Sequence, residues 1–178
     1  MYYEIIDDFL PRDSFEEIRR IVLSPKIGWQ YSPIITSNSH EQFDGYFVHL
    51  LIGDGIIKSE FTDNFLPKVS ELMPPHYFIT RAKLNLYTRQ SSVIRHGAHR
   101  DADYPHHTAL FYFNDTDGPT ILHHPTEGEI EVECRANRIV CFDGFMQHRS
   151  TTCTNYPVRI NLNINYLPAL PVEMPENM

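Results

Sequence analysis

The stretch that decides the fold opens with His99-Arg100-Asp101, continues through the apolar run Thr108-Ala109-Leu110-Phe111-Tyr112-Phe113, and ends at His148 and Arg159. On a β-strand, side chains two residues apart point to the same face of the sheet. His99 and Asp101 can therefore present an imidazole and a carboxylate side by side. In a chain with ten histidines this pair is weak evidence by itself. The order of the segments that follow it gives it weight.

A second imidazole could come from His148, which follows a β-rich interval and a turn at Asp143-Gly144. Folding of the sheet would bring this residue back to the first pair. Two imidazoles and one carboxylate on one face of a metal ion leave coordination positions open, which is typical of non-haem Fe(II) sites that activate oxygen. We therefore predict that His99, Asp101 and His148 bind a metal ion.

The last strand of the predicted sheet, residues 158–166, alternates cleanly between apolar and polar side chains. Its polar face carries Arg159, Asn161, Asn163 and Asn165. Such a face can lie in water, or it can point into the cavity of a barrel while the apolar face is covered by helices. Asn85 and Tyr87 show the same kind of pattern on an earlier strand, and this favours an interior lined by polar side chains.

Taken together, the H-x-D pair, the distal histidine and the arginine resemble the Fe(II)/2-oxoglutarate-dependent oxygenases, in particular their prolyl-4-hydroxylase-like branch of compact bacterial and phage type. The similarity covers residues 81–166, about half of the chain. It implies Fe(II) bound by His99, Asp101 and His148, with 2-oxoglutarate and O₂ as co-substrates and ascorbate as a further candidate cofactor. The interval from His148 to Arg159 is slightly longer than in many members, which indicates a local loop.

The resemblance also implies a set of side chains that bind 2-oxoglutarate. Arg159 would hold the carboxylate far from the metal, because a guanidinium can bind a carboxylate bidentately. Tyr87 and Tyr112 would add phenolic donors. Asn163, on the same strand face as Arg159, and Asn85, beside Tyr87, are further candidates.

The implied reaction is hydroxylation of an unactivated C–H bond, coupled to decarboxylation of 2-oxoglutarate to succinate and CO₂. The prolyl-hydroxylase-like resemblance favours a peptidyl residue or an amino acid as substrate, although a fold does not identify a substrate. Two other functions stay open. A cupin-like metalloprotein that does not use 2-oxoglutarate would have no need of Arg159, and a non-catalytic jelly-roll binding module would need neither the metal ligands nor Arg159.

The other histidines offer rival metal sites that stay weaker than the first. His96 and His99 could form a zinc pair, and His106-His107 and His123-His124 are further possible ligand sets. None of them has a carboxylate or cysteine partner at the usual ligand spacing. We expect these residues to be surface groups or neighbours of the main site.

Composition sets the broad class. A chain of 178 residues is long enough for one domain with its own core. The formal net charge of −8 argues against nucleic acid as a partner. The three cysteines form no C-x-x-C motif, and the sequence predicts neither a signal peptide nor a membrane span. The expected location is the cytoplasm, and the sequence does not indicate an oligomeric state.

The pattern of short strands predicts a mainly β fold with some α-helix: a double-stranded β-helix (jelly-roll) core over residues 77–168, with N-terminal helices packed on one sheet. The strands are expected at 81–87, 108–113, 121–123, 129–134, 139–142 and 158–166, with a turn at residues 115–119. Residues 1–76 form the helical and loop prelude, and the whole chain is one oxygenase domain.

In the prelude, residues 3–9 predict a strand, and Ser14 with Glu17 has the form of a capping box at the start of a helix that runs to about residue 23. Residues 47–52 predict a further strand. Residues 65–73 have helical spacing and end at Pro74-Pro75. Residues 28–46 show little periodicity, and we expect them to form a loop that closes over the site.

Overall fold

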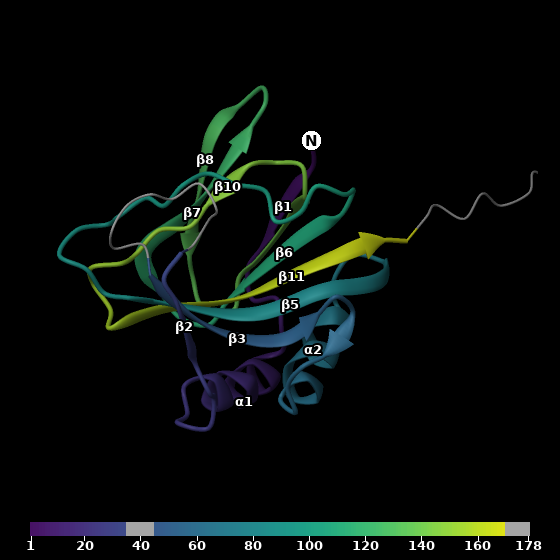
Figure 1. Cartoon of the computed structure of the whole chain (residues 1–178), viewed down its shortest axis with the longest axis vertical. Coiled ribbons are helices and arrows are strands. Elements are labelled where there is room, and N and C mark those ends of the chain that lie inside the picture. Colours follow the sequence, from purple (N-terminus) through teal and green to yellow (C-terminus); the bar gives the residue numbers. More distant parts are fainter. Residues whose placement is uncertain (35–44, 170–178) are drawn as a thin grey trace, which may run out of the picture.

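The structure, a computed structural model, describes residues 1–34 and 45–169 and contains two antiparallel sheets (Figure 1). The larger sheet has eight strands in the order β1-β9-β6-β11-β5-β3-β2, with β4 paired to β3. These strands are β1 (Tyr3–Ile6), β2 (Gln30–Ser32), β3 (Tyr46–Gly53), β4 (Ile56–Ile57), β5 (His76–Thr88), β6 (His107–Tyr112), β9 (Ile139–Asp143) and β11 (Val158–Pro168). The smaller sheet has the order β10-β7-β8, with β7 (Thr116–His124), β8 (Gly128–Cys134) and β10 (His148–Arg149).

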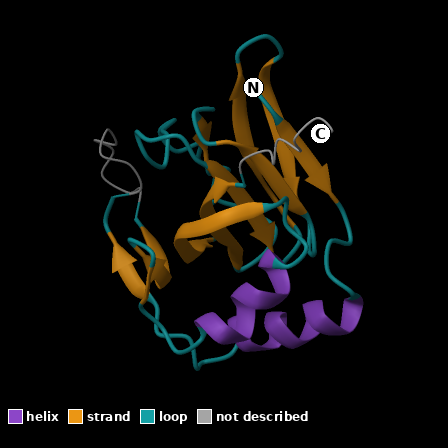
Figure 2. Cartoon of the chain, turned by 90° about the vertical axis from the view of Figure 1, so that its right-hand side faces the viewer, coloured by secondary structure: helices purple, strands orange, loops and turns teal. Residues whose placement is uncertain are grey.

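Two helices, α1 (Arg12–Val22) and α2 (Thr62–Ser70), cover the outer face of the larger sheet (Figure 2). Their apolar residues at helical spacing form the contact, with Ile18 and Phe65 fully buried. They share one core with side chains of the central strands, among them Leu84 and Leu162. Burial of this apolar surface, at roughly 25 cal/mol per Å², is the main stabilising contribution. The predicted jelly roll with helices packed on one sheet is confirmed.

A second core fills part of the space between the two sheets. It consists of buried apolar side chains from both sheets, including Leu110, Leu122, Val132 and Phe142. The remaining space between the sheets is lined by polar side chains. The molecule therefore has three layers, and its polar cavity lies between the two sheets.

Strand β11 lies in the middle of the larger sheet and determines which side chains share that cavity. It pairs with β5 on one side and with β6 on the other. Residues directly opposite each other on paired strands share a face. The register places Arg159 opposite Tyr87, Asn161 opposite Asn85, and Asn163 opposite Lys83. The polar faces of two strands that lie far apart in the sequence thus become one surface.

The start of α1 corrects the predicted capping box. The helix begins at Arg12, and its first turn has no side-chain cap hydrogen bond. Ser14 is the third helical residue, so it lies inside the first turn and not at the cap. Pro11 precedes the first helical residue, and its fixed φ suits this position. The acidic Asp13 in the first turn interacts favourably with the positive end of the helix.

Other boundaries also differ from the prediction. α2 ends at Ser70, and Leu72 is 49% exposed because it lies beyond the helix. Residues 116–119, predicted as a turn, belong to an irregular start of β7, where the register with β8 shifts between Thr116 and Thr120. β1 is shorter than residues 3–9 and pairs with β9, so the prelude contributes strands to the larger sheet.

The predicted loop at 28–46 is in part a strand, because Gln30–Ser32 pairs with β3 as β2. Residues 35–44, the centre of the proposed lid, lie outside the described residues. The three cysteines are buried free thiols, as expected from their spacing. Neither described helix is long and apolar enough to cross a lipid bilayer.

Candidate metal and co-substrate site

The sheet brings His99 and His148 together from opposite ends of the jelly roll. The backbone N–H of each residue donates to the carbonyl of the other, both at 2.9 Å, which is the pattern of a hydrogen-bonded antiparallel pair. Their ring centroids are 4.6 Å apart. Candidate ligand atoms of His99, Asp101 and His148 all lie within 4.8 Å of one another. The three residues predicted to bind the metal are thus neighbours in the structure.

Asp101 is held by hydrogen bonds from both strands that flank the cavity. Its side chain is only 4% exposed. The Asn165 amide donates to Oδ2 at 2.8 Å and the Asn163 amide at 3.2 Å. Arg81 Nη2 lies 2.6 Å from Oδ1. These contacts fix the orientation of the carboxylate, as outer-shell partners of metal ligands commonly do.

The protonation states of the cluster suit a metal ion. Burial lowers the pKa of His99, and it lowers the pKa of His148 to about 4, so both imidazoles are neutral at neutral pH. Burial alone would raise the pKa of Asp101, but His148, Arg81 and Lys83 together outweigh it and hold that pKa well below its usual range. Neutral imidazoles and an ionised carboxylate are the forms that bind metal.

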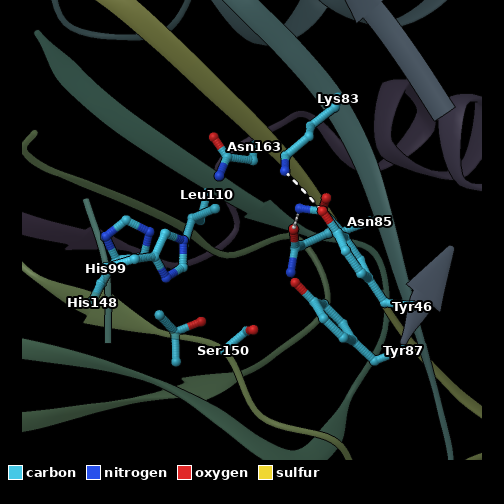
Figure 3. A pocket seen from close by; sticks show the side chains of 11 residues that line it. Tyr46, Lys83, Asn85, Tyr87, His99, Leu110, His148, Ser150 and Asn163 are labelled. Carbon is cyan, nitrogen blue, oxygen red and sulfur yellow. Dashed lines mark hydrogen bonds between the residues drawn. The ribbon is translucent and has the colours of Figure 1, made fainter. Parts of the chain in front are cut away.

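A pocket between the sheets adjoins these residues (Figure 3). His99 and His148 line one side of it, and Tyr46 and Tyr87 line the other. Of the predicted co-substrate residues, Tyr87, Asn85 and Asn163 line the pocket. The Asn85 amide donates to the Asn161 side-chain carbonyl at 2.9 Å, which fixes its position. Asn163 donates to Asp101, as described above.

Arg159 lies behind the pocket wall and is fully buried. Its Nε donates to the Gly118 carbonyl and its Nη2 to Thr120 Oγ1, both at 2.7 Å. Its Cζ lies 5.3 Å from the centroid of the Tyr87 ring and 5.6 Å from that of Tyr112. The guanidinium is therefore packed between two aromatic rings, which is a favourable arrangement for a cation.

One nitrogen of this guanidinium, Nη1, is buried without a hydrogen-bond partner among the described residues. A buried polar group of this kind is costly unless a partner meets it. Tyr112 also stands behind the wall, and its hydroxyl donates to Thr120 Oγ1 at 2.8 Å. Thr120 itself lines the pocket and links both residues to it. An anion at this end of the pocket would satisfy Nη1.

Sequence reasoning missed four residues of the site: Thr120, Ser150, Arg81 and Lys83. Thr120 and Ser150 gave no signal, because they were expected in or near turns. Lys83 had a signal, since it shares a strand face with Asn85 and Tyr87 at a spacing of two residues. Arg81 continues the same face, and its pairing with Asp101 became visible only with the strand register.

The rival histidine sites do not form. His96 Nδ1 hydrogen-bonds Ser150 Oγ at 2.9 Å, and its ring stacks on Tyr87 with the centroids 5.5 Å apart. His106 bonds the Tyr104 carbonyl, and His123 accepts from Arg149 Nε. Within residues 1–34 and 45–169, the cluster of His99, Asp101 and His148 is the only group of three or more possible ligands.

No protein-family profile and no curated protein matches the sequence. Solved structures do match. An oxidoreductase of the 2OG-Fe(II) oxygenase family from Burkholderia pseudomallei is 16% identical, with a TM-score of 0.68 over 93% of this chain and 84% of that one. A prolyl hydroxylase from Trichoplax adhaerens, in complex with a hypoxia inducible factor peptide fragment, is 15% identical, with a TM-score of 0.68 over 93% and 83%.

A prolyl-4-hydroxylase from Pseudomonas putida is 19% identical, with a TM-score of 0.60 over 94% of this chain and 92% of that one. The match in each case spans both sheets and most of the partner chain. The resemblance seen in the sequence is thus also a resemblance in three dimensions. This chain has the fold of the 2OG-Fe(II) oxygenases, prolyl hydroxylases among them.

Proposed function

We propose that the protein is an Fe(II)- and 2-oxoglutarate-dependent dioxygenase that hydroxylates an unactivated C–H bond of a peptidyl residue or an amino acid, releasing succinate and CO₂. The observation that carries this proposal is the convergence of His99, Asp101 and His148 beside a pocket whose far wall holds an arginine with an unpartnered nitrogen. A metal site and an anion site at opposite sides of one pocket fit a co-substrate with a carboxylate at each end.

In this proposal His99, Asp101 and His148 hold the metal. Bound iron would supply open coordination positions for O₂ and the redox chemistry of the reaction. Arg159 and Tyr112, through the wall at Thr120, would meet the remote carboxylate of 2-oxoglutarate. Tyr87, Asn85 and Asn163 would line its path. The chain thereby orients the co-substrate and limits access of water to it.

The donor set fits iron better than zinc. A structural zinc site usually has four protein ligands that include cysteine or additional histidine. The cluster offers two imidazoles and one carboxylate, and all three cysteines are buried away from it as free thiols. A cupin-like metalloprotein without 2-oxoglutarate would give no reason for the buried guanidinium of Arg159. The same applies to a non-catalytic jelly-roll binding module.

The first test is metal binding. We expect Asp101→Ala and His99→Ala to abolish stoichiometric Fe(II) binding in anaerobic titration, with the fold retained as judged by circular dichroism. Asp103→Ala is the matched control, because Asp103 is an exposed carboxylate two residues away. Iron-loaded wild type should then bind 2-oxoglutarate and convert it to succinate when peptides and amino acids are screened as substrates.

Equal iron affinity in wild type and Asp101→Ala would contradict the ligand assignment. Iron binding without any affinity for 2-oxoglutarate would instead favour the cupin-like function. Binding of neither would leave the jelly-roll binding module as the better account. These three outcomes are separated by two titrations on the same preparations.

A further inference from the structure

A second cation, Lys83, points into the pocket and has no role in the site as proposed so far. It lies on β5, on the face that also carries Asn85 and Tyr87, and it lines the pocket with the metal cluster (Figure 3). Its only hydrogen bond within the described residues goes from Nζ to the Tyr46 hydroxyl, at 3.2 Å. An ammonium has three donors. Two of them have no partner in this part of the chain.

Tyr46 is held firmly beside this lysine. It is the first residue of β3 and only 6% exposed. Its ring stacks on Tyr87, with centroids 5.4 Å apart and an angle of 11° between the planes. Because its hydroxyl accepts from Lys83, its own proton is free to be donated to a ligand in the pocket. Lys83 and Tyr46 together offer donors to one point.

The two cations of the pocket lie at different places. Lys83 is four residues from Tyr87 along β5, and Tyr87 is the residue paired with Arg159. At about 3.3 Å per residue this separation is roughly 13 Å. Arg159 is sealed behind the wall, whereas Lys83 is half-buried and open to the pocket. One carboxylate cannot be shared by both.

The surroundings of Lys83 disfavour an isolated charge. Burial lowers the pKa of Lys83, and Arg81 lowers it further, while Asp101 opposes this. The described residues give Lys83 no ion pair, so a buried ammonium here needs an anion from elsewhere. The chain as a whole carries a formal net charge of −8. Attraction of an anion to this point must therefore come from a local arrangement of cations and not from overall charge.

We propose that Lys83, with the Tyr46 hydroxyl, binds a carboxylate of the substrate, so that the enzyme acts on an acidic molecule: an amino acid or peptide with a carboxylate near the reacting carbon. This inference rests on the proposed function, in which Arg159 and the metal account for both ends of 2-oxoglutarate. Lys83 is paired on the sheet with Asn163, which donates to Asp101. A carboxylate bound here would hold the substrate next to the metal cluster.

The same chemistry could have another source, because the carboxylate of 2-oxoglutarate at the metal could also reach Lys83. The first arm of the test separates the two. The affinity of the anaerobic Fe(II)-loaded protein for 2-oxoglutarate is measured by calorimetry in wild type and Lys83→Met. We expect the two dissociation constants to agree within about threefold. A loss of tenfold or more in Lys83→Met would assign the lysine to the co-substrate and overturn the proposal.

The second arm uses matched probes: N-acetyl amino acids and the corresponding N-acetyl amino acid amides, titrated into the anaerobic Fe(II)/2-oxoglutarate complex. At least one acid should bind more tightly than its amide. Lys83→Met should remove this preference, a loss of roughly ten- to a hundredfold for a charge-assisted hydrogen bond. Lys83→Arg should restore part of it. Tyr46→Phe, which removes only a hydroxyl, should weaken the acid by less than Lys83→Met.

Lys58→Met is the control, because Lys58 is exposed and distant in the sheet from the pocket face. It should leave both arms unchanged. A panel in which no acid is preferred to its amide, or in which the preference survives in Lys83→Met, overturns the inference while leaving the proposed function intact. Failure of the wild type to bind Fe(II) and 2-oxoglutarate contradicts the proposed function and this inference with it.

Discussion

The two faces of β11 are both buried, yet they differ in almost every other respect. One face carries Ile160, Leu162 and Ile164, which pack into the core beneath the helices. The opposite face begins with Arg159 and continues with three asparagines, each at most 5% exposed. A strand buried only for stability is expected to be apolar on both faces, because a buried amide is costly unless it is hydrogen-bonded.

The polar face is retained at the expense of easy burial, and its hydrogen bonds show why. Asn161 accepts from Asn85, and Asn163 and Asn165 both donate to Asp101. Arg159 donates to Gly118 and Thr120. The apolar face thus stabilises the domain, whereas the polar face positions a carboxylate and a guanidinium at two ends of a pocket. Substitutions on the two faces should therefore affect different measurements.

The largest expected effect comes from placing a polar residue on the apolar face. Leu162→Asn removes a fully buried leucine side chain, a change that costs about 2–5 kcal/mol when the replacement is alanine. It also leaves an amide without a partner, at about 1–3 kcal/mol more. The sum is comparable with the total stability of a typical domain, about 5–15 kcal/mol. We expect urea denaturation to show severe destabilisation or no folded protein.

Leu162→Met is the matched control, because it keeps the volume and apolar character and should cost less than about 1.5 kcal/mol. Iron binding by folded Leu162→Met protein should equal that of the wild type. A Leu162→Asn protein as stable as the wild type would show that this face is not packed as described.

The second effect concerns the polar face. Arg159→Ala removes the cation proposed to meet the remote carboxylate, and loss of one partner of a buried charge pair costs about 2–5 kcal/mol, or roughly thirty- to several-thousand-fold in affinity. Calorimetry on the anaerobic Fe(II)-loaded protein should show this loss for 2-oxoglutarate. Iron affinity should be nearly unchanged, because Arg159 does not belong to the metal cluster.

Arg95→Ala serves as the control, since Arg95 is an exposed arginine paired with Glu129 and Glu131 on the surface. If 2-oxoglutarate bound equally well to Arg159→Ala and to the wild type, the polar face would lose its proposed purpose at this end. The cupin-like function would then gain support over the oxygenase.

The alternation of β11 could be predicted because both faces follow a period of two, and the sequence contains the pattern directly. The sequence also predicted His99, Asp101 and His148 as a group, which the antiparallel bridge between His99 and His148 makes possible. Their role as ligands stays a prediction, as does that of Arg159. The direction of the polar face was open in the sequence, and the sheet order decided it.

What could not be predicted depends on register between distant strands. The contact of Arg81 with Asp101 requires β5 and β11 to pair with Asn165 opposite Arg81. Thr120 reaches Arg159 only because β7 begins within the predicted turn. The start of α1 was misplaced because the Ser14–Glu17 pattern also fits the interior of a first turn. Local patterns identify faces and periods, but they do not identify partners.

The smallest expected effect separates the two phenols that flank Arg159. Tyr112→Phe removes a hydroxyl that donates to Thr120 Oγ1 at 2.8 Å, and Tyr87→Phe removes one at the pocket wall. A neutral hydrogen bond contributes about 0.5–1.5 kcal/mol, so each variant should weaken 2-oxoglutarate by roughly two- to twelvefold. Both rings remain, and with them the packing of the guanidinium between Tyr87 and Tyr112. Calorimetry under the conditions used for Arg159→Ala measures both. A loss in either variant as large as that of Arg159→Ala would make a phenol, and not the guanidinium, the main anchor of the co-substrate.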